Sequence, residues 1–305
     1  MPHLNYFHLN PVFEIIPEAI FFQQTNLICE ISTNSFSYIF ENDIEKKFYG
    51  LSVFHFDKKD FDISEQLKDI FKEQSLLRKN YKKVFISFSG EESALLPEEL
   101  YNPGGNASLL NALYGDLHDG IILTDLVADK KLYNVYRMPA AIHKVIVEQF
   151  PLAVFSHQYS LLIKQEFGSS DLLKIIFYKD TFVATLIKSG ELKLMHTYLY
   201  QSGTDVVYHL LNICRQFDMA NVPLRIGGMI EIDSNLHKEI SHYFPNITFD
   251  ELPAEYEFAV SLKEFPPHYF SHLYSLALCV YSVAYMAEER YHPRQKCHIH
   301  VPLLI

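Results

Sequence analysis

Glycine is scarce in this 305-residue chain, so one glycine pair stands out as a candidate ligand site. Only 11 residues are glycine, about half of the usual ~7 % share, and loops that cradle phosphate on bare backbone are therefore few. The pair Gly227-Gly228 directly follows a short apolar run. The alternative interpretation of the pair is a tight turn between a strand and a helix.

A second candidate is the C-terminal run that holds Cys297, His298 and His300. A thiolate and two imidazoles are ligands that zinc accepts, and the two histidines would share a face only on a strand. No second group of ligands lies nearby in the sequence, so a closed tetrahedral site lacks donors. A solvated tail is the favoured interpretation, and we expect no metal site.

The motifs of the common enzyme classes are missing. The chain contains no G-x-S-x-G, Walker A, H-E-x-x-H or G-x-G-x-x-G run, and we assign no catalytic residue. The net charge is −11, and neither half of the chain is basic, which argues against a nucleic-acid partner.

The sequence also bears on the compartment. The most apolar stretch, Leu273–Ala287, has 15 residues, whereas a membrane span needs about 20. No secretory signal is visible at Met1, and there is no C-x-x-C pair among the four cysteines. We expect a cytoplasmic protein with reduced thiols and no membrane span.

The glycine pair belongs to the second of two similar series of elements. In the first series, three strands are expected at Asn26–Ser32, Ser35–Glu41 and Phe48–Phe56, joined by short polar turns. A helix capped by Asp62 and a short strand at Lys83–Phe88 follow. Alternating apolar residues indicate the strands, and a stripe at helical spacing indicates the helix.

The second series repeats this order. Its strands are expected at Leu172–Tyr178, Thr181–Ile187 and Leu192–Leu199, followed by a helix capped by Ser202 and a strand at Pro223–Ile226. The layout predicts an α/β protein with a duplicated unit, although no residue identities support the duplication. We place one lobe at 24–167 with an insertion at about 91–138, a second lobe at 168–290, and a tail at 291–305.

This layout resembles the actin-like ATPase architecture, in which each lobe is similar to a ribonuclease-H-like module. Closer still, the chain resembles an uncharacterised bacterial family assigned that fold, with Pro97–Leu100 (P-E-E-L) after the fourth strand as a further cue. Pilus and secretion scaffolds of the superfamily are the natural comparison for the inserted segment. The resemblance implies a nucleotide, ATP with magnesium, between the lobes.

The resemblance also implies which residues would contact that nucleotide. The first phosphate loop, D-x-G-[ST], matches the run from Glu30 to Ser35; Glu30 replaces the aspartate and Ser32 the glycine, while Thr33 and Ser35 keep hydroxyls that could donate to phosphate. The second loop falls at Tyr178–Thr181, where Asp180 remains without a glycine. The adenosine segment matches Gly227 and Gly228. The first loop could equally be an ordinary hairpin turn.

One of the three nucleotide motifs is therefore kept, and we expect a protein that needs no cofactor. Our main hypothesis is a non-catalytic or degenerate nucleotide-binding member of the actin-like fold that acts as an interaction module with a protein partner. The alternative is a divergent ATPase or phosphotransferase in which Glu30 and an acid of the second lobe face each other across the cleft. Carboxylates at metal-ligand spacing beside Gly227 would favour an enzyme, and aromatic side chains filling the cleft there would favour a scaffold. The sequence does not indicate the oligomeric state.

Overall fold

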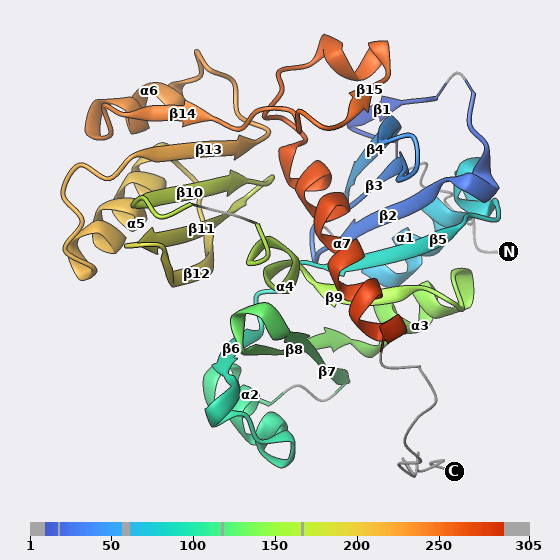
Figure 1. The fold of residues 1–305 in the computed structure, drawn as a ribbon, viewed down its shortest axis with the longest axis horizontal. Coiled ribbons are helices and arrows are strands. Elements are labelled where there is room, and N and C mark those ends of the chain that lie inside the picture. The colour runs from blue at the N-terminus through green and yellow to red at the C-terminus, as the bar shows by residue number, and fades with distance from the viewer. Residues whose placement is uncertain (1–9, 18, 57–61, 117–118, 166–167, 290–305) are drawn as a thin grey trace, which may run out of the picture.

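The computed structural model describes residues 10–289 except 18, 57–61, 117–118 and 166–167, and for 281–289 it describes the backbone alone. Two separate sheets form two lobes, a third small sheet extends from the first lobe, and a long helix runs between the lobes (Figure 1). The zinc candidates Cys297, His298 and His300 lie outside the described residues.

The sheet of the first lobe has the order β1-β4-β3-β2-β5-β9. Its strands are β1 (Phe13–Ile15), β2 (Asn26–Ile31), β3 (Ser35–Asn42), β4 (Lys47–His55), β5 (Lys83–Phe88) and β9 (Val154–His157). Strands β2, β3 and β4 pair antiparallel, whereas β5 joins β2 in parallel and β9 joins β5 in parallel. Helix α1 (Ile63–Glu73) follows the meander, and Asp62 caps it by accepting from the Ser64 backbone N–H at 2.9 Å. The second sheet repeats the first.

The sheet of the second lobe has the order β12-β11-β10-β13-β14. Its strands are β10 (Leu172–Phe177), β11 (Thr181–Lys188), β12 (Glu191–Leu199), β13 (Leu224–Gly228) and β14 (Ile247–Phe249). The lobes share a pairing pattern: β2 pairs antiparallel with β3 and in parallel with β5, and β10 pairs antiparallel with β11 and in parallel with β13. Helices α5 (Gly203–Gln216) and α6 (Asn235–Tyr243) complete this lobe, and Ser202 with Asp205 forms the capping box of α5.

A register slip at the same position in both lobes supports the predicted duplication. The register of the second strand on the third slips after Phe40 in β3 and after Leu186 in β11. Each slip follows the sixth residue of its strand. Because a register slip bends a strand and increases its twist, the two lobes share a detail of curvature that hydrophobic pattern alone does not reveal.

The insertion forms a three-stranded antiparallel sheet, β6-β8-β7, with a helix on it. Its elements are β6 (Ser93–Pro97), α2 (Asn106–Tyr114), β7 (Gly120–Val127) and β8 (Leu132–Pro139). Helix α3 (Ala140–Gln149) then returns the chain to the first sheet. The P-E-E-L run at Pro97–Leu100 comprises the last residue of β6 and one 3₁₀ turn at Glu98–Leu100.

The C-terminal part of the chain returns to the first lobe. Strand β15 (Glu257–Phe258) pairs in parallel with β4, and α7 (Ser271–Glu289) packs on β2, β3, β13 and on α4 (Gln158–Leu162). Figure 1 shows α7 crossing between the sheets. A lobe boundary at 168 does not predict this return, and the lobe limits stay a prediction.

One continuous hydrophobic core joins the two sheets through α7. It contains residues from β2–β5, from α4, from β10–β12 and from α7. The aromatic rings of Phe48 and Tyr274 pack 5.1 Å apart between their centroids. Separate cores lie under α1 and α3 in the first lobe and under α5 and α6 in the second. Within the described part of the chain, no helix combines the length and the apolar character that a membrane span requires.

Candidate functional site

The first candidate phosphate loop is the hairpin between β2 and β3. The Ser32 hydroxyl lies 2.6 Å from Asn34 Oδ1 and 2.9 Å from Ser35 Oγ, and it accepts from the backbone N–H groups of Asn34 and Ser35 at 3.1 and 3.0 Å. Short polar side chains commonly bond their own backbone in this way in turns. Ser32 is buried, Ser35 is half-buried and Thr33 is exposed at the tip. The hydroxyls of Ser32 and Ser35 are thus engaged within the loop.

The second candidate phosphate loop touches the first. Asp180 lies between β10 and β11, and its Oδ1 accepts from the side-chain amide of Asn34. Tyr200 closes this loop from the other side, because its hydroxyl donates to the Tyr178 carbonyl at 3.0 Å. The tertiary structure therefore brings together the two predicted loops, which are 146 positions apart in the sequence at this contact. Their direct hydrogen bond joins the two lobes.

Glu30, on β2, lies in a buried polar network. Its Oε1 accepts from Ser89 Oγ at 2.7 Å, from Gln158 Nε2 at 3.0 Å and from Tyr178 Oη at 3.0 Å. Burial raises the pKa of Glu30 to about 7, although the hydrogen bonds from Ser89 and Tyr178 oppose the rise. The charged form is disfavoured because a buried carboxylate loses its hydration.

The other carboxyl oxygen faces α7. Glu30 Oε2 lies 3.5 Å from His272 Nε2, and within the described residues neither Glu30 Oε2 nor His272 Nδ1 has a hydrogen-bond partner. Burial and, to a lesser extent, the nearby Lys174 charge lower the pKa of His272 to about 3. The histidine is therefore neutral at pH 7, and the contact is not an ion pair.

The glycine pair ends β13, where both residues are buried. Gly228 has φ +86°, and a Cβ on it would lie 2.1 Å from the Phe177 carbonyl oxygen. A side chain is excluded there by backbone conformation and by the close strand β10. Gly228 also donates its N–H to the His268 carbonyl at 2.8 Å. The turn after β13 is therefore one that glycine alone fits.

Gly227 faces an ion pair rather than an open space. A Cβ on Gly227 would lie 2.5 Å from both Asp250 Oδ2 and Ser271 Oγ. Ser271 donates to Asp250 at 2.8 Å, and Lys174 Nζ lies 3.0 Å from the same carboxyl oxygen, with both side chains about nine-tenths buried. The first turn of α7 thus covers Gly227 with Ser271 and reaches Glu30 with His272.

The sequence did not single out Lys174, Asp250, Gln158 or His272 as cleft residues. One signal was available, because Lys174 is the only charged residue of an apolar strand, and a buried lysine requires a partner. No group of three or more His, Cys, Asp or Glu suited to a metal ion occurs in the described part of the chain. Nothing in the structure tests ligand binding at Ser32, Thr33, Ser35, Gly227 or Gly228, so that assignment stays a prediction.

Comparison with known proteins gives a family and a fold for the chain. A family model described as a protein of unknown function (DUF3822) matches residues 18–247. Among solved structures, a Bacteroides thetaiotaomicron VPI-5482 protein with an actin-like ATPase fold and unknown function has a TM-score of 0.69 and 19 % identity, covering 85 % of this chain and 97 % of its own. No curated protein matches.

A second solved structure, the PilM-PilN type IV pilus biogenesis complex, has a TM-score of 0.59 at 10 % identity and covers 83 % of this chain and 97 % of its own. At these identities the comparisons show the fold alone. The predicted actin-like ATPase fold with two ribonuclease-H-like lobes is confirmed.

Proposed function

The chain belongs to the DUF3822 family of proteins of unknown function, and we propose that it is a non-catalytic member of the actin-like fold that acts as an interaction module. In this proposal the cleft between the lobes is a fixed joint rather than a site of nucleotide turnover. The observation that carries the proposal is the hydrogen bond between Asn34 and Asp180, because it spans the gap between the two loops that would otherwise enclose phosphates.

The surroundings of the glycine pair support the same function. A purine or ribose that packed on Gly227 would displace Ser271 and Asp250, and Asp250 could not move without exposing or stranding the buried Lys174 charge. Removing one partner of a buried ion pair costs about 3–5 kcal/mol. In this arrangement the residues present do not fit ATP with magnesium bound on the glycine pair.

The aromatic filling of the cleft points the same way. Tyr178 and His272 meet edge to face at 5.1 Å between ring centroids, and both side chains contact Glu30. A carboxylate that holds magnesium needs access to water and to the ion, whereas Glu30 is enclosed by side chains from both lobes. The PilM structure, determined with PilN, is a member of this fold found in a protein complex, which is in keeping with an interaction role.

Titration calorimetry with ATP and magnesium tests the proposal. We expect no binding heat up to millimolar nucleotide and no change in the thermal midpoint. The thermal measurement is sensitive, because a ligand at 100 times its Kd adds about 2.7 kcal/mol of stability. Micromolar affinity in either measurement would overturn the proposal, and circular dichroism on the same sample shows that the protein is folded.

A divergent ATPase or phosphotransferase is the second candidate, and Glu30 favours it. A buried carboxyl group with a pKa near 7 is a form that acid–base catalysts take. Phosphate release that is measurable in the wild type and lost in Glu30→Gln would establish this candidate. We expect no turnover above buffer in either protein.

The proposed compartment is the cytoplasm. Three cysteines fall within the described residues, and none of them is in a disulfide; Cys29 and Cys279 are buried. Burial raises the pKa of the Cys279 thiol to about 11, so it stays protonated and unreactive. Free thiols are typical of a reducing compartment.

A further inference from the structure

We propose that a groove at the amino ends of β5 and β9 binds a protein segment in which acidic residues alternate with apolar ones. The groove is a hollow of about 700 Å³ between two stretches of chain, 77–84 and 149–154. The inference supplies a partner chemistry for the proposed interaction module and rests on that proposed function only in this respect.

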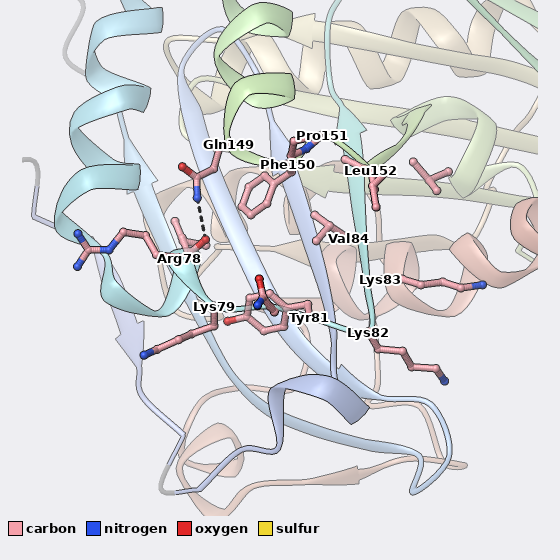
Figure 2. Close-up of a pocket in the computed structure, with 14 residues that line it drawn as sticks. Arg78, Lys79, Tyr81, Lys82, Lys83, Val84, Gln149, Phe150, Pro151 and Leu152 are labelled. Atoms are coloured by element: carbon pink, nitrogen blue, oxygen red, sulfur yellow. Dashed lines mark hydrogen bonds between the residues drawn. The ribbon is translucent and has the colours of Figure 1, made fainter.

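The groove has an apolar floor. Leu77, Val84 and Phe150 line it, and Figure 2 shows Val84 and Phe150 near its centre. The Gln149 side-chain amide donates to the Leu77 carbonyl at 3.0 Å and ties the two stretches together, while Tyr81 donates to the Leu76 carbonyl at 2.8 Å. These bonds fix the two stretches relative to each other and fix the position of Tyr81.

The charged residues on the rim all have one sign. They are Arg78, Lys79, Lys82 and Lys83, and the residues that line the groove include no acid. Figure 2 shows Arg78 and Lys79 extending to one side of the apolar centre and Lys82 and Lys83 to the other. This concentration of positive charge occurs in a protein of net charge −11, so it attracts an acidic ligand that the rest of the surface repels.

Part of the positive charge is already balanced. Lys82 Nζ lies 2.8 Å from both carboxyl oxygens of Asp43, and Lys79 lies over the ring of Phe22 at 5.8 Å from its centroid. Lys79 is nevertheless exposed, as is Arg78. These two side chains are therefore the ones we expect to meet carboxylates of a partner.

A second hollow extends the groove and favours a chain-like ligand. It has a volume of about 380 Å³, is lined by 20–24, and shares Lys79 and Asn80 with the first. Large apolar side chains stand exposed along this path: Leu152 is 94 % and Phe21 73 % exposed. An exposed leucine beside an apolar hollow is typical of an interaction site, and two joined hollows suit several consecutive residues.

A protein segment fits these features better than a nucleic acid does. The exposed apolar side chains of the larger hollow, Pro151, Leu152 and Val154, are aliphatic, whereas its aromatic residues are half-buried (Tyr81) or buried (Phe150). The larger hollow therefore offers a base little exposed aromatic surface for stacking. The hollow is concave and apolar at its centre, so it accepts side chains such as leucine or phenylalanine between flanking carboxylates. A helix or strand with such a pattern would place both kinds of side chain at once.

The test begins with a phage-displayed library of random 12-residue peptides, selected on the full chain. Binders are then counter-selected on the Lys79→Glu variant. We expect the enriched peptides to carry Asp or Glu together with Leu, Ile or Phe. Enrichment of basic peptides, or no enrichment that depends on Lys79, would overturn the inference.

Fluorescence anisotropy of the most enriched peptide gives the quantitative result. We expect at least tenfold weaker binding to Lys79→Glu and to Leu152→Asp, because one loses the countercharge and the other the apolar contact. The matched controls are Lys263→Glu and Val260→Asp, two exposed positions in the segment that follows β15. Strand β15 pairs with β4, which is separated from β5 and β9 by β3 and β2. Equal losses in the controls, or none in the groove variants, would contradict the proposal.

Two further measurements test whether the groove binds something other than a protein segment. Groove-dependent binding of a 15-nucleotide thymidine strand, or of vesicles with one-third phosphatidylserine, would replace the peptide by another anionic partner and overturn the inference. Groove-dependent dimerisation in light scattering would assign the surface to a second copy instead. The nucleotide titration of the cleft is independent of all these results, so failure of the groove and failure of the proposed function are distinguishable.

Discussion

Glu30 shows how position changes what a carboxyl group does. In the superfamily pattern an acid at this place would hold magnesium and water, but here its first oxygen is saturated by Ser89, Gln158 and Tyr178. Its second oxygen meets a neutral histidine. The residue type fits an enzyme, whereas its contacts fit a joint between lobes.

The raised pKa of Glu30 predicts a pH-dependent stability. A carboxyl group with a pKa of about 7 when folded and 4.5 when unfolded binds more protons in the folded state between these values. Its contribution to stability is therefore present below pH 4.5 and is lost as the pH rises through 7, by roughly 3 kcal/mol in total.

Urea unfolding of the wild type and of Glu30→Gln from pH 4 to 8 measures this loss. The comparison is needed because His157 and His272, whose pKa values burial lowers to about 3, contribute with the opposite sign between pH 3 and 6.5. We expect the wild type to lose stability relative to Glu30→Gln as the pH rises. A difference that stays constant over the range would show that Glu30 is not buried in this network.

Gly228 allows a second prediction at the scale of one residue. Gly228→Ala combines a left-handed backbone with a contact of 2.1 Å to the Phe177 carbonyl, so we expect at least about 2 kcal/mol of destabilisation. Gly190→Ala is the matched control, because Gly190 has φ +77° but its nearest neighbour would lie 3.4 Å away, and we expect about 1 kcal/mol. Equal losses in urea unfolding would mean that the close approach of β10 is absent.

Among the elements, helix α7 connects the two lobes through its contacts with both sheets. Its first turn supplies Ser271 to the glycine pair and His272 to Glu30, and its next turns fill the shared core. A helix that contacts β2, β3 and β13 together transmits strain between the sheets rather than allowing them to swing apart.

Truncation within α7 tests this role. Leu273 is fully buried in the shared core, so Leu273→Ala should cost about 3 kcal/mol through the cavity it leaves. Leu278, on the same helix, is 40 % exposed, and Leu278→Ala should cost less than about 1 kcal/mol. Urea unfolding of both variants checks the difference, and similar small effects would show that α7 does not seal the joint.

For the whole molecule, the shared core predicts joint unfolding. The buried residues of both sheets form one cluster with α7, so neither lobe keeps its apolar surface covered when the other opens. Native-state hydrogen exchange should give β2 and β10 the same opening free energy, and Leu273→Ala should lower both equally. Independent exchange of the two strands would show that the lobes are separate folding units.

The sequence by itself determined the two series of strands and helices, because alternation and helical spacing are set by residues a few positions apart. It indicated β2, β3, β4 and their counterparts within one or two residues. It missed β1, β6 and β15, since two to five residues carry no clear period and only their pairing makes them strands.

The tertiary structure decided what the cleft contains. Nothing local to Glu30 indicates His272, and nothing local to Gly227 indicates Asp250, because these contacts form only when α7 packs on both sheets and β14 pairs with β13. The sequence supplied hydroxyls, an acid and two glycines in the order of a nucleotide fold. The groups that these side chains contact depend on burial and on the free energy of bringing distant segments together. The spacing of neighbouring residues determines neither of these quantities.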